Sequence, residues 1–146
     1  FGPWQFPEKL IPVSIINGLK NKKIPIYGDG KNIRDWLFVE DHITALIKVM
    51  QKGKVGNSYC IGGENEKCNE EIVNIICSIL DELNPRNSPH IKLKEFIKDR
   101  PGHDKRYAIN NTKIKQDIKW QPSFDFTKSI KITVEWYMKN LNWCKK

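Results

Sequence analysis

The segment Lys98–Tyr107 groups charged side chains, a histidine and a tyrosine around a Pro-Gly pair. Proline fixes its own φ and glycine permits a positive φ, so Pro101-Gly102 predicts a turn that presents Arg100 and His103 from one small arc. The planar guanidinium of Arg100 suits a phosphate or a carboxylate. The segment therefore predicts an anion-binding loop, and a solvated, charged surface loop is the other interpretation.

Other residues could extend such a site. Arg34 directly precedes the apolar run Trp36–Phe38, and a strand there would fix its guanidinium, whereas a surface ion pair with Asp29 or Asp35 is the alternative. Asn69 is expected where a helix begins, a place that suits either an anion or a simple helix cap. The candidate anion donors are Lys9, Arg34, Arg100, His103 and Arg106. Tyr27, Trp36 and Trp4 could stack on a base or belong to the core.

The motifs of a self-contained enzyme are missing from the sequence. Gly28-Asp29-Gly30 and Gly62-Gly63 do not have the G-x-G-x-x-G spacing of a dinucleotide site and are interpreted as turns. Glu40–His42 is expected to begin a helix, and His90 is expected at the surface. The four cysteines form no C-x-x-C pair, which favours free thiols in a reducing, cytoplasmic setting and predicts no metal site.

The composition fits one domain with a real core. The 146 residues are 39% hydrophobic and 29% charged, and no apolar run approaches the roughly 20 residues of a membrane span. The net charge of +8 would suit nucleic acid, an anionic membrane surface or a phosphorylated small molecule. Because the basic residues are spread along the chain, charge alone does not choose among them.

Alternating short strands and helices predict an α/β fold with too few strands for a complete doubly wound sheet. The clearest helix follows Asn69, where isoleucines and leucines repeat at helical spacing to Leu83, with Cys77 as a small core residue. The first of the other helices is expected from Pro7 or Pro12 to 18–21, and the second from Glu40 or Asp41 with a buried face at Ile43, Leu46, Ile47 and Met50. A short helix capped within Asn110–Thr112 is expected to end near Trp120, and a final helix is expected from Asp125 to about Asn140. The strands are expected at 24–27, 34–39, 57–61 and 91–96.

Several segments together resemble the dTDP-glucose 4,6-dehydratase family of extended short-chain dehydrogenase/reductases. They run from the first residue nearly to the last: Phe1–Pro3, Phe6–Pro12, Pro25–Gly30, Arg34–Leu37, Val39–His42, Ile61–Gly63, Asp99–Asp104 and Trp136-Tyr137. The most specific are Phe6–Pro12 and Asp99–Asp104. The resemblance implies that residues 1–146 are the C-terminal, sugar-nucleotide-binding portion of a Rossmann-like fold. Its NAD-binding domain and catalytic residues would lie upstream of Phe1, where the chain starts without a methionine.

The resemblance also implies a reaction and a site. The full-length lyase would use bound NAD to oxidise dTDP-glucose at C4, eliminate water across C5 and C6, and return the hydride to C6, giving dTDP-4-keto-6-deoxyglucose. It would be a cytoplasmic homodimer, joined through the missing domain, that binds neither nucleic acid nor membrane, and the fragment alone is expected to be inactive. The family's substrate contacts fall on Lys9, Leu10, Pro25, Ile26, Tyr27, Arg34, Asn69, Asp99, Arg100, Pro101, Gly102 and His103.

Two alternatives stay open at this stage. One is a related nucleotide-sugar enzyme, namely a 4-epimerase, a UDP-glucuronate decarboxylase or a GDP-mannose 4,6-dehydratase. The other is a basic nucleic-acid-binding module, against which the lack of a clustered Lys/Arg stripe argues.

Overall fold

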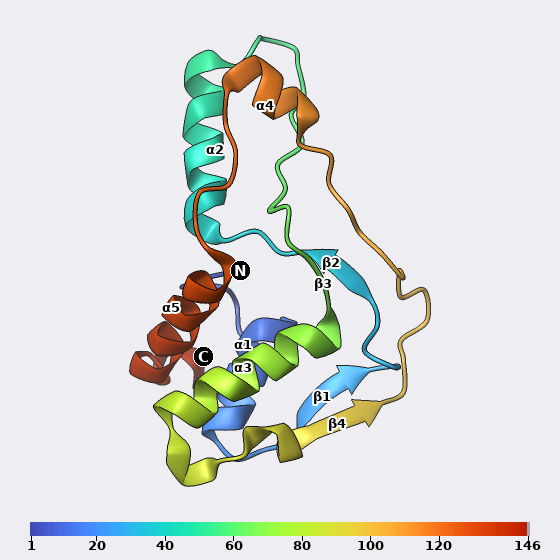
Figure 1. Cartoon of the computed structure of the whole chain (residues 1–146), viewed down its shortest axis with the longest axis vertical. Coiled ribbons are helices and arrows are strands. Elements are labelled where there is room, and N and C mark those ends of the chain that lie inside the picture. Colours follow the sequence, from blue (N-terminus) through green and yellow to red (C-terminus); the bar gives the residue numbers. More distant parts are fainter. Residues whose placement is uncertain (146) are drawn as a thin grey trace.

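The computed structural model describes residues 1–145, except the side chain of Lys145. It is an α/β arrangement in which helices supply most of the structure (Figure 1). The helices are α1 (Leu10–Leu19), α2 (Val39–Lys52), α3 (Asn69–Leu83), α4 (Thr112–Ile118) and α5 (Phe126–Lys139), with 3-10 turns at Pro85–Asn87, His90–Leu93 and Trp143–Lys145. The strands are β1 (Ile24–Tyr27), β2 (Ile33–Asp35), β3 (Glu66–Cys68) and β4 (Lys94–Ile97). None of the described helices has the length and apolarity to cross a bilayer.

The four strands form two separate pairs. β1 lies parallel to β4, with Ile24 opposite Lys94, and β2 lies antiparallel to β3, with Ile33 opposite Cys68. Ile33 also bridges to Arg106, so β2 has the chain after β4 on its other side. Each pair joins segments that are far apart in sequence and brings the loop after β4 next to β2.

The core has three clusters of buried residues. The largest lies between α1, α3 and α5 and includes Ile15, Ile76 and Tyr137, and a second connects α3 to β1 through Val73 and Ile26. The third lies between α2 and α4 and consists of Ala45, Ile114, Ile118 and Trp120. Figure 1 shows α2 and α4 side by side at one end of the molecule, away from the β1–β4 pair.

The buried face expected for α2 is wrong. Ile43, Leu46, Ile47 and Met50 are between 43% and 82% exposed, because α2 packs onto α4 with a different face, the one that carries Ala45 and Val49. The helical period was correct, but the period alone does not say which apolar face finds a partner.

We expect this difference to appear in a matched pair of substitutions. Leu46→Ala should change the free energy of unfolding by less than about 0.5 kcal/mol, as is usual for surface positions. Ile114→Ala removes a fully buried side chain and should cost about 2–5 kcal/mol. Urea unfolding of the two variants measures both values, and equal losses would show that the outer face of α2 is packed.

Several element boundaries also differ from expectation. The segment 57–61 is not a strand, since no other described segment pairs with it, and the strand expected at 34–39 is only Ile33–Asp35. The strand expected at 91–96 starts at Lys94, after a 3-10 turn. Helix α1 begins at Leu10, which places Pro12 in the first turn, where a proline is tolerated.

The helix starts confirm some caps and correct others. Asp125 caps α5 by accepting a hydrogen bond from the Lys128 backbone N–H at 2.8 Å. At α3 the cap is Cys68, whose backbone N–H is bound by the Glu71 carboxylate at 2.7 Å, so Asn69 is the first helical residue. At α2 Phe38 is the N-cap residue, and Asp41 lies buried in the first turn, where it accepts hydrogen bonds from Ser123 and Phe124.

The expectation that His90 is a surface residue is wrong. Its side chain is fully buried, with Nδ1 2.6 Å from the Asp81 carboxylate, and its backbone N–H donates to the same oxygen at 2.8 Å. Burial by itself would raise the pKa of Asp81, but the hydrogen bonds from His90 and Ser88 outweigh it and hold that pKa below 3.8. Asp81 on α3 supplies the hydrogen bond that replaces water at the buried Nδ1 atom of His90.

Asp81→Asn should therefore destabilise the protein in a pH-dependent way. Because the folded state lowers the pKa of Asp81, its stabilisation is complete above pH 3.8 and is lost as the pH falls through the lowered pKa. We expect a loss of about 1.5–3 kcal/mol at pH 7, and little difference from wild type at a pH well below 3.8. Glu82→Gln, which breaks an exposed pair with Lys131, is the control and should cost under about 1 kcal/mol. A loss that stays constant from pH 7 downward would contradict the role of the ionised carboxylate.

Candidate functional site

A cavity of about 520 Å³ opens between the two strand pairs and the first helix. Its walls come from the loop before α1, the first turn of α1, β1, β2, the start of α3 and the loop after β4. The lining residues are Gln5, Glu8, Lys9, Leu10, Ile11, Val13, Pro25, Tyr27, Arg34, Trp36, Asn69, Arg100 and His103. With Lys9, Arg34 and Arg100 in its walls, the cavity suits an elongated, negatively charged ligand.

Most of the substrate contacts expected from the sequence meet in this cavity. Eight of the twelve line it: Lys9, Leu10, Pro25, Tyr27, Arg34, Asn69, Arg100 and His103. The side chain of Ile26 lies in the core instead, because successive side chains of β1 point to opposite faces. Asp99, Pro101 and Gly102 are not among the lining residues, and Gly102 has the positive φ (68°) of the expected turn.

Arg34 is held by backbone groups and forms none of the ion pairs considered from the sequence. Its two terminal nitrogens donate to the carbonyls of Ile33 and Asp104, at 2.7 and 2.9 Å. Asp35 accepts from the backbone N–H groups of Gly63 and Asn65 at 2.9 and 3.0 Å, which ties β2 to the loop before β3. The guanidinium keeps its charge uncompensated by any described carboxylate while it lines the cavity.

His103 is fixed by a carboxylate. Its side chain is only 6% exposed, and its Nδ1 is 2.7 Å from Asp99, which also accepts the Arg100 backbone N–H at 2.9 Å. The hydrogen bond from His103 holds the pKa of Asp99 below its usual range. Asp99 thus orders the turn and the imidazole ring without itself lining the cavity.

Lys9 and Asn69 are two further polar groups of the lining. Lys9 has an ion pair with Glu8 at 2.7 Å, but both side chains are about 60% exposed, so water weakens the pair. Lys9 can therefore leave Glu8 and pair with an anionic ligand instead. Asn69 is released from the expected capping role by Cys68, and its amide is one of the polar groups of the wall.

Sequence reasoning left five lining residues out of the site: Gln5, Glu8, Ile11, Val13 and Trp36. Of these, only Trp36 had been considered for the ligand, as a residue that could stack on a base or belong to the core. Trp36 is anchored by its indole N–H, which donates to the Lys67 carbonyl at 3.0 Å.

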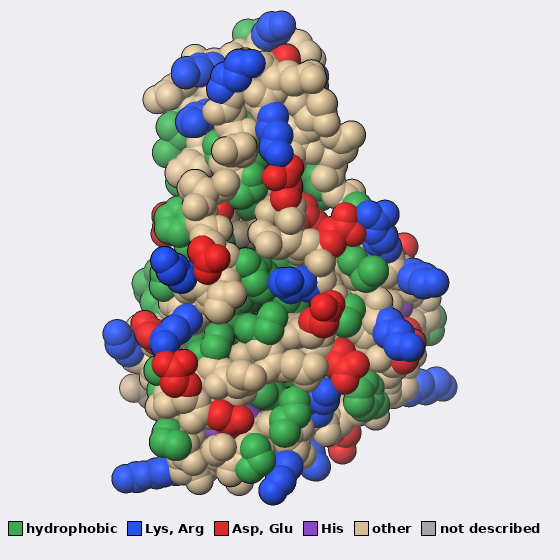
Figure 2. Space-filling view, viewed as in Figure 1, with side chains coloured by type: hydrophobic (Ala, Val, Ile, Leu, Met, Phe, Trp, Pro, Cys, Tyr) green, Lys and Arg blue, Asp and Glu red, His purple; other side chains and the backbone are tan. Residues whose placement is uncertain are grey.

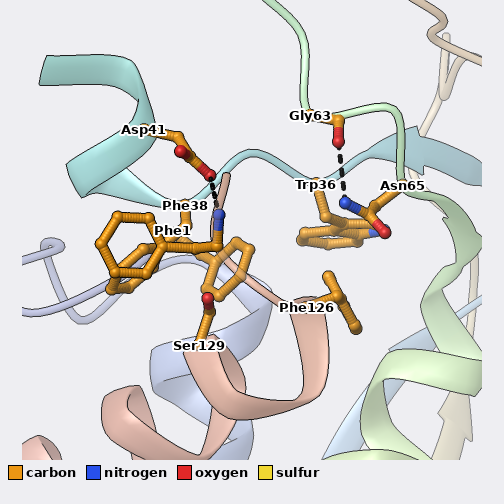
Figure 3. Close-up of a pocket in the computed structure, with 9 residues that line it drawn as sticks. Phe1, Trp36, Phe38, Asp41, Gly63, Asn65, Phe126 and Ser129 are labelled. Atoms are coloured by element: carbon orange, nitrogen blue, oxygen red, sulfur yellow. Dashed lines mark hydrogen bonds between the residues drawn. The ribbon is translucent and has the colours of Figure 1, made fainter. Parts of the chain in front are cut away.

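Figure 3 shows Trp36 beside a second, small cavity near Phe1, Phe38 and Phe126. At about 10 Å³ that space holds no more than one water.

The face shown in Figure 2 carries basic side chains that are distributed from end to end and interspersed with acidic ones. Several basic side chains of the protein are paired with carboxylates, as in the two hydrogen bonds of Arg106 to Glu66 at 2.7 and 2.8 Å. This face lacks the continuous basic stripe that a nucleic-acid surface would present.

The model of the GDP-mannose 4,6 dehydratase family matches residues 2–133 of this sequence. The chain belongs to this family. The dTDP-glucose 4,6-dehydratase of Escherichia coli is 50% identical over 143 residues, which are 98% of this chain and 40% of the relative. The Neisseria meningitidis enzyme of the same name is 50% identical over 147 residues, covering 98% and 41%. The chain thus spans about 40% of the length of these curated relatives.

Solved structures of proteins with the same enzyme name are also similar to this chain. The dTDP-glucose 4,6-dehydratase of Bacillus anthracis, in complex with NAD, superimposes with a TM-score of 0.88 at 47% identity, over 99% of this chain and 44% of that one. DesIV, the Streptomyces venezuelae enzyme with NAD and TYD bound, gives 0.88 at 36% identity, over 98% and 42%. The resemblance to dTDP-glucose 4,6-dehydratase and the α/β fold of extended short-chain dehydrogenase/reductases are confirmed.

Proposed function

We propose that residues 1–146 are the C-terminal, substrate-binding portion of a dTDP-glucose 4,6-dehydratase, and that the NAD-binding Rossmann domain lies N-terminal to them. The full-length enzyme would convert dTDP-glucose to dTDP-4-keto-6-deoxyglucose and water. The observation that carries the proposal is the cavity, which collects eight of the twelve expected contacts from five separate parts of the chain. Relatives at 50% identity that carry this enzyme name support it.

The chemistry of the walls suggests how dTDP-glucose would bind. A diphosphate needs directed donors, and Arg34, Arg100 and His103 all line the cavity and can offer them. The nucleobase would lie against Pro25 and Tyr27, and Tyr27 is 44% exposed, which leaves it accessible for stacking. The remaining expected contacts among the lining residues are Lys9, Leu10 and Asn69.

The described residues do not fit NAD. The Gly28–Gly30 turn joins strands of two different sheets, and Gly62-Gly63 lies in an irregular loop where a Cβ on Gly63 would be 2.4 Å from the Trp36 carbonyl oxygen. Neither place has the strand–turn–helix that receives a pyrophosphate. We therefore assign NAD, the catalytic groups and the homodimer contact to the N-terminal domain, and the role of this chain is to bind and orient the sugar nucleotide. We also propose a cytoplasmic location, consistent with four free cysteines.

The proposal is tested by assaying the full-length protein with dTDP-glucose, UDP-glucose and GDP-mannose. We expect formation of a 4-keto-6-deoxy product from dTDP-glucose, with kcat/KM at least tenfold above that for the other two sugars. Equal turnover of dTDP-glucose and UDP-glucose, or an epimer as product, would refute the assignment. Steeply salt-dependent binding to mixed-sequence DNA, without a response to dTDP, would favour the nucleic-acid module instead.

A further inference from the structure

We propose that Tyr107 is a positioning residue that, together with Asp104, holds the Arg34 guanidinium ready for the diphosphate of the nucleotide. This inference rests on the proposed function. Tyr107 does not line the cavity, and no substrate contact is expected there from the sequence. Its role would be exerted entirely through Arg34.

The backbone fixes Tyr107 next to the strand that carries Arg34. The Ile33 backbone N–H donates to the Lys105 carbonyl at 2.8 Å, and the Tyr107 N–H donates back to the Ile33 carbonyl at 3.0 Å. The Asn32 side chain adds a bond to the Asp104 carbonyl at 3.2 Å. The segment 104–107 is thus attached to β2 at both of its ends, so its side chains have a defined position relative to Arg34.

The tyrosine ring supports the guanidinium from one face. The Cζ atom of Arg34 is 4.6 Å from the centre of the Tyr107 ring, within the range of a cation–π contact. A guanidinium has five N–H donors in one plane, and the carbonyls of Ile33 and Asp104 use two of them. The ring limits tilting of that plane without using any donor, which leaves three N–H groups for a ligand in the cavity.

The tyrosine hydroxyl has a separate effect on Asp104. It donates a hydrogen bond to the Asp104 carboxylate, and this bond raises the pKa of Tyr107, so the hydroxyl stays a donor. Asp104 therefore binds Arg34 only through its backbone carbonyl, while its carboxylate is held by Tyr107. A carboxylate free to pair with Arg34 would compete with the diphosphate for the same donors.

The chain offers a matched control. Tyr59 also has a cation over its ring, with Lys113 Nζ 4.8 Å from the ring centre, and its hydroxyl also contacts an aspartate, Asp117, at 3.5 Å. Tyr59 belongs to the α2–α4 end of the molecule and is not among the residues that line the cavity. Replacing Tyr59 removes the same kind of interaction at a place that should not affect the ligand.

The test is calorimetric titration of the full-length protein with dTDP and with thymidine, which carries no phosphate. Tyr107→Leu should weaken dTDP binding about tenfold and change thymidine binding less than twofold, whereas Tyr59→Leu should change neither. Adding Tyr107→Leu to Arg34→Ala should cause no further loss of dTDP affinity, because Tyr107 acts on the ligand only through the Arg34 guanidinium. The inference would be overturned if the losses of dTDP affinity from the two single substitutions added in the double variant. It would also be overturned if Tyr107→Leu weakened thymidine binding as much as dTDP binding.

The hydroxyl is tested separately. Tyr107→Phe keeps the ring but frees the Asp104 carboxylate, so we expect dTDP binding to weaken several-fold, and Asp104→Asn in the same protein should restore it to within twofold of wild type. Failure of that rescue would overturn the part assigned to the hydroxyl. If wild-type protein binds dTDP no more tightly than thymidine, the proposed function itself fails. If wild-type protein does bind dTDP but the losses from Tyr107→Leu and Arg34→Ala add, only the role of Tyr107 fails.

Discussion

Arg34→Ala is expected to weaken dTDP binding about 10- to 100-fold, the largest effect that we expect of a single residue on the ligand. Charge-assisted hydrogen bonds are worth about 1.5–3 kcal/mol each, and a phosphate can take two from one guanidinium. Arg34 lines the cavity with its charge unpaired among the described residues. Isothermal titration of the full-length protein with dTDP measures the change.

Arg106→Ala is the matched control for Arg34→Ala. Arg106 is next to Tyr107 in sequence, but its guanidinium is bound by Glu66 and does not line the cavity. Its removal should leave dTDP affinity within about twofold of wild type, since only a solvent-exposed pair is lost. Arg34→Lys should recover only part of the loss, because an ammonium keeps the charge without the planar fork. Equal effects of Arg34→Ala and Arg106→Ala would mean that Arg34 acts through general charge and not through contact.

Local chemistry was enough to predict the parts of the site that depend on a few neighbouring residues. The Pro-Gly turn at 101–102 and the alternation of Pro25, Ile26 and Tyr27 follow from backbone preferences, and the cavity contains the residues placed on them. The assembly of five chain segments around one space came only from the family resemblance, because nothing in the local pattern of Lys9 or Asn69 points to Arg100.

The expectations that were wrong depend on partners far away in sequence. His90 lies among polar residues, and only the return of the chain past α3 gives it the carboxylate of Asp81 and a buried place. The segment 57–61 has the composition of a strand, but none of the described strands pairs with it. Helix α2 has two apolar faces, and the choice between them is made by Trp120 and α4. Burial is a property of a pair of surfaces, so one sequence segment cannot reveal it.

Trp120→Ala is expected to have the largest effect on stability, about 3–5 kcal/mol. Trp120 is 2% exposed, packs on Ala45, Ile114 and Ile118, and its indole N–H donates to the Thr44 hydroxyl at 3.0 Å. Trp120, which follows α4, thus belongs to the buried cluster that joins α2 to α4. Hydrogen exchange followed by mass spectrometry should therefore show loss of protection over 39–52 and 112–118 first.

The same variant separates the stability of the fold from the function of the site. The α2–α4 cluster shares no buried residue with the clusters around α1, α3 and β1, and it contributes none of the residues that line the large cavity. Cooperative units of this kind can open while the rest of the fold stays intact.

Folded Trp120→Ala protein should thus bind dTDP within about twofold of wild type. Tyr137→Ala, a change of similar size in the α1–α3–α5 cluster, should weaken binding as well, because the Tyr137 hydroxyl donates to the carbonyl of Gln5 in the cavity wall. If Trp120→Ala loses dTDP affinity in proportion to its stability, the two ends of the molecule form one cooperative unit and the separation is wrong.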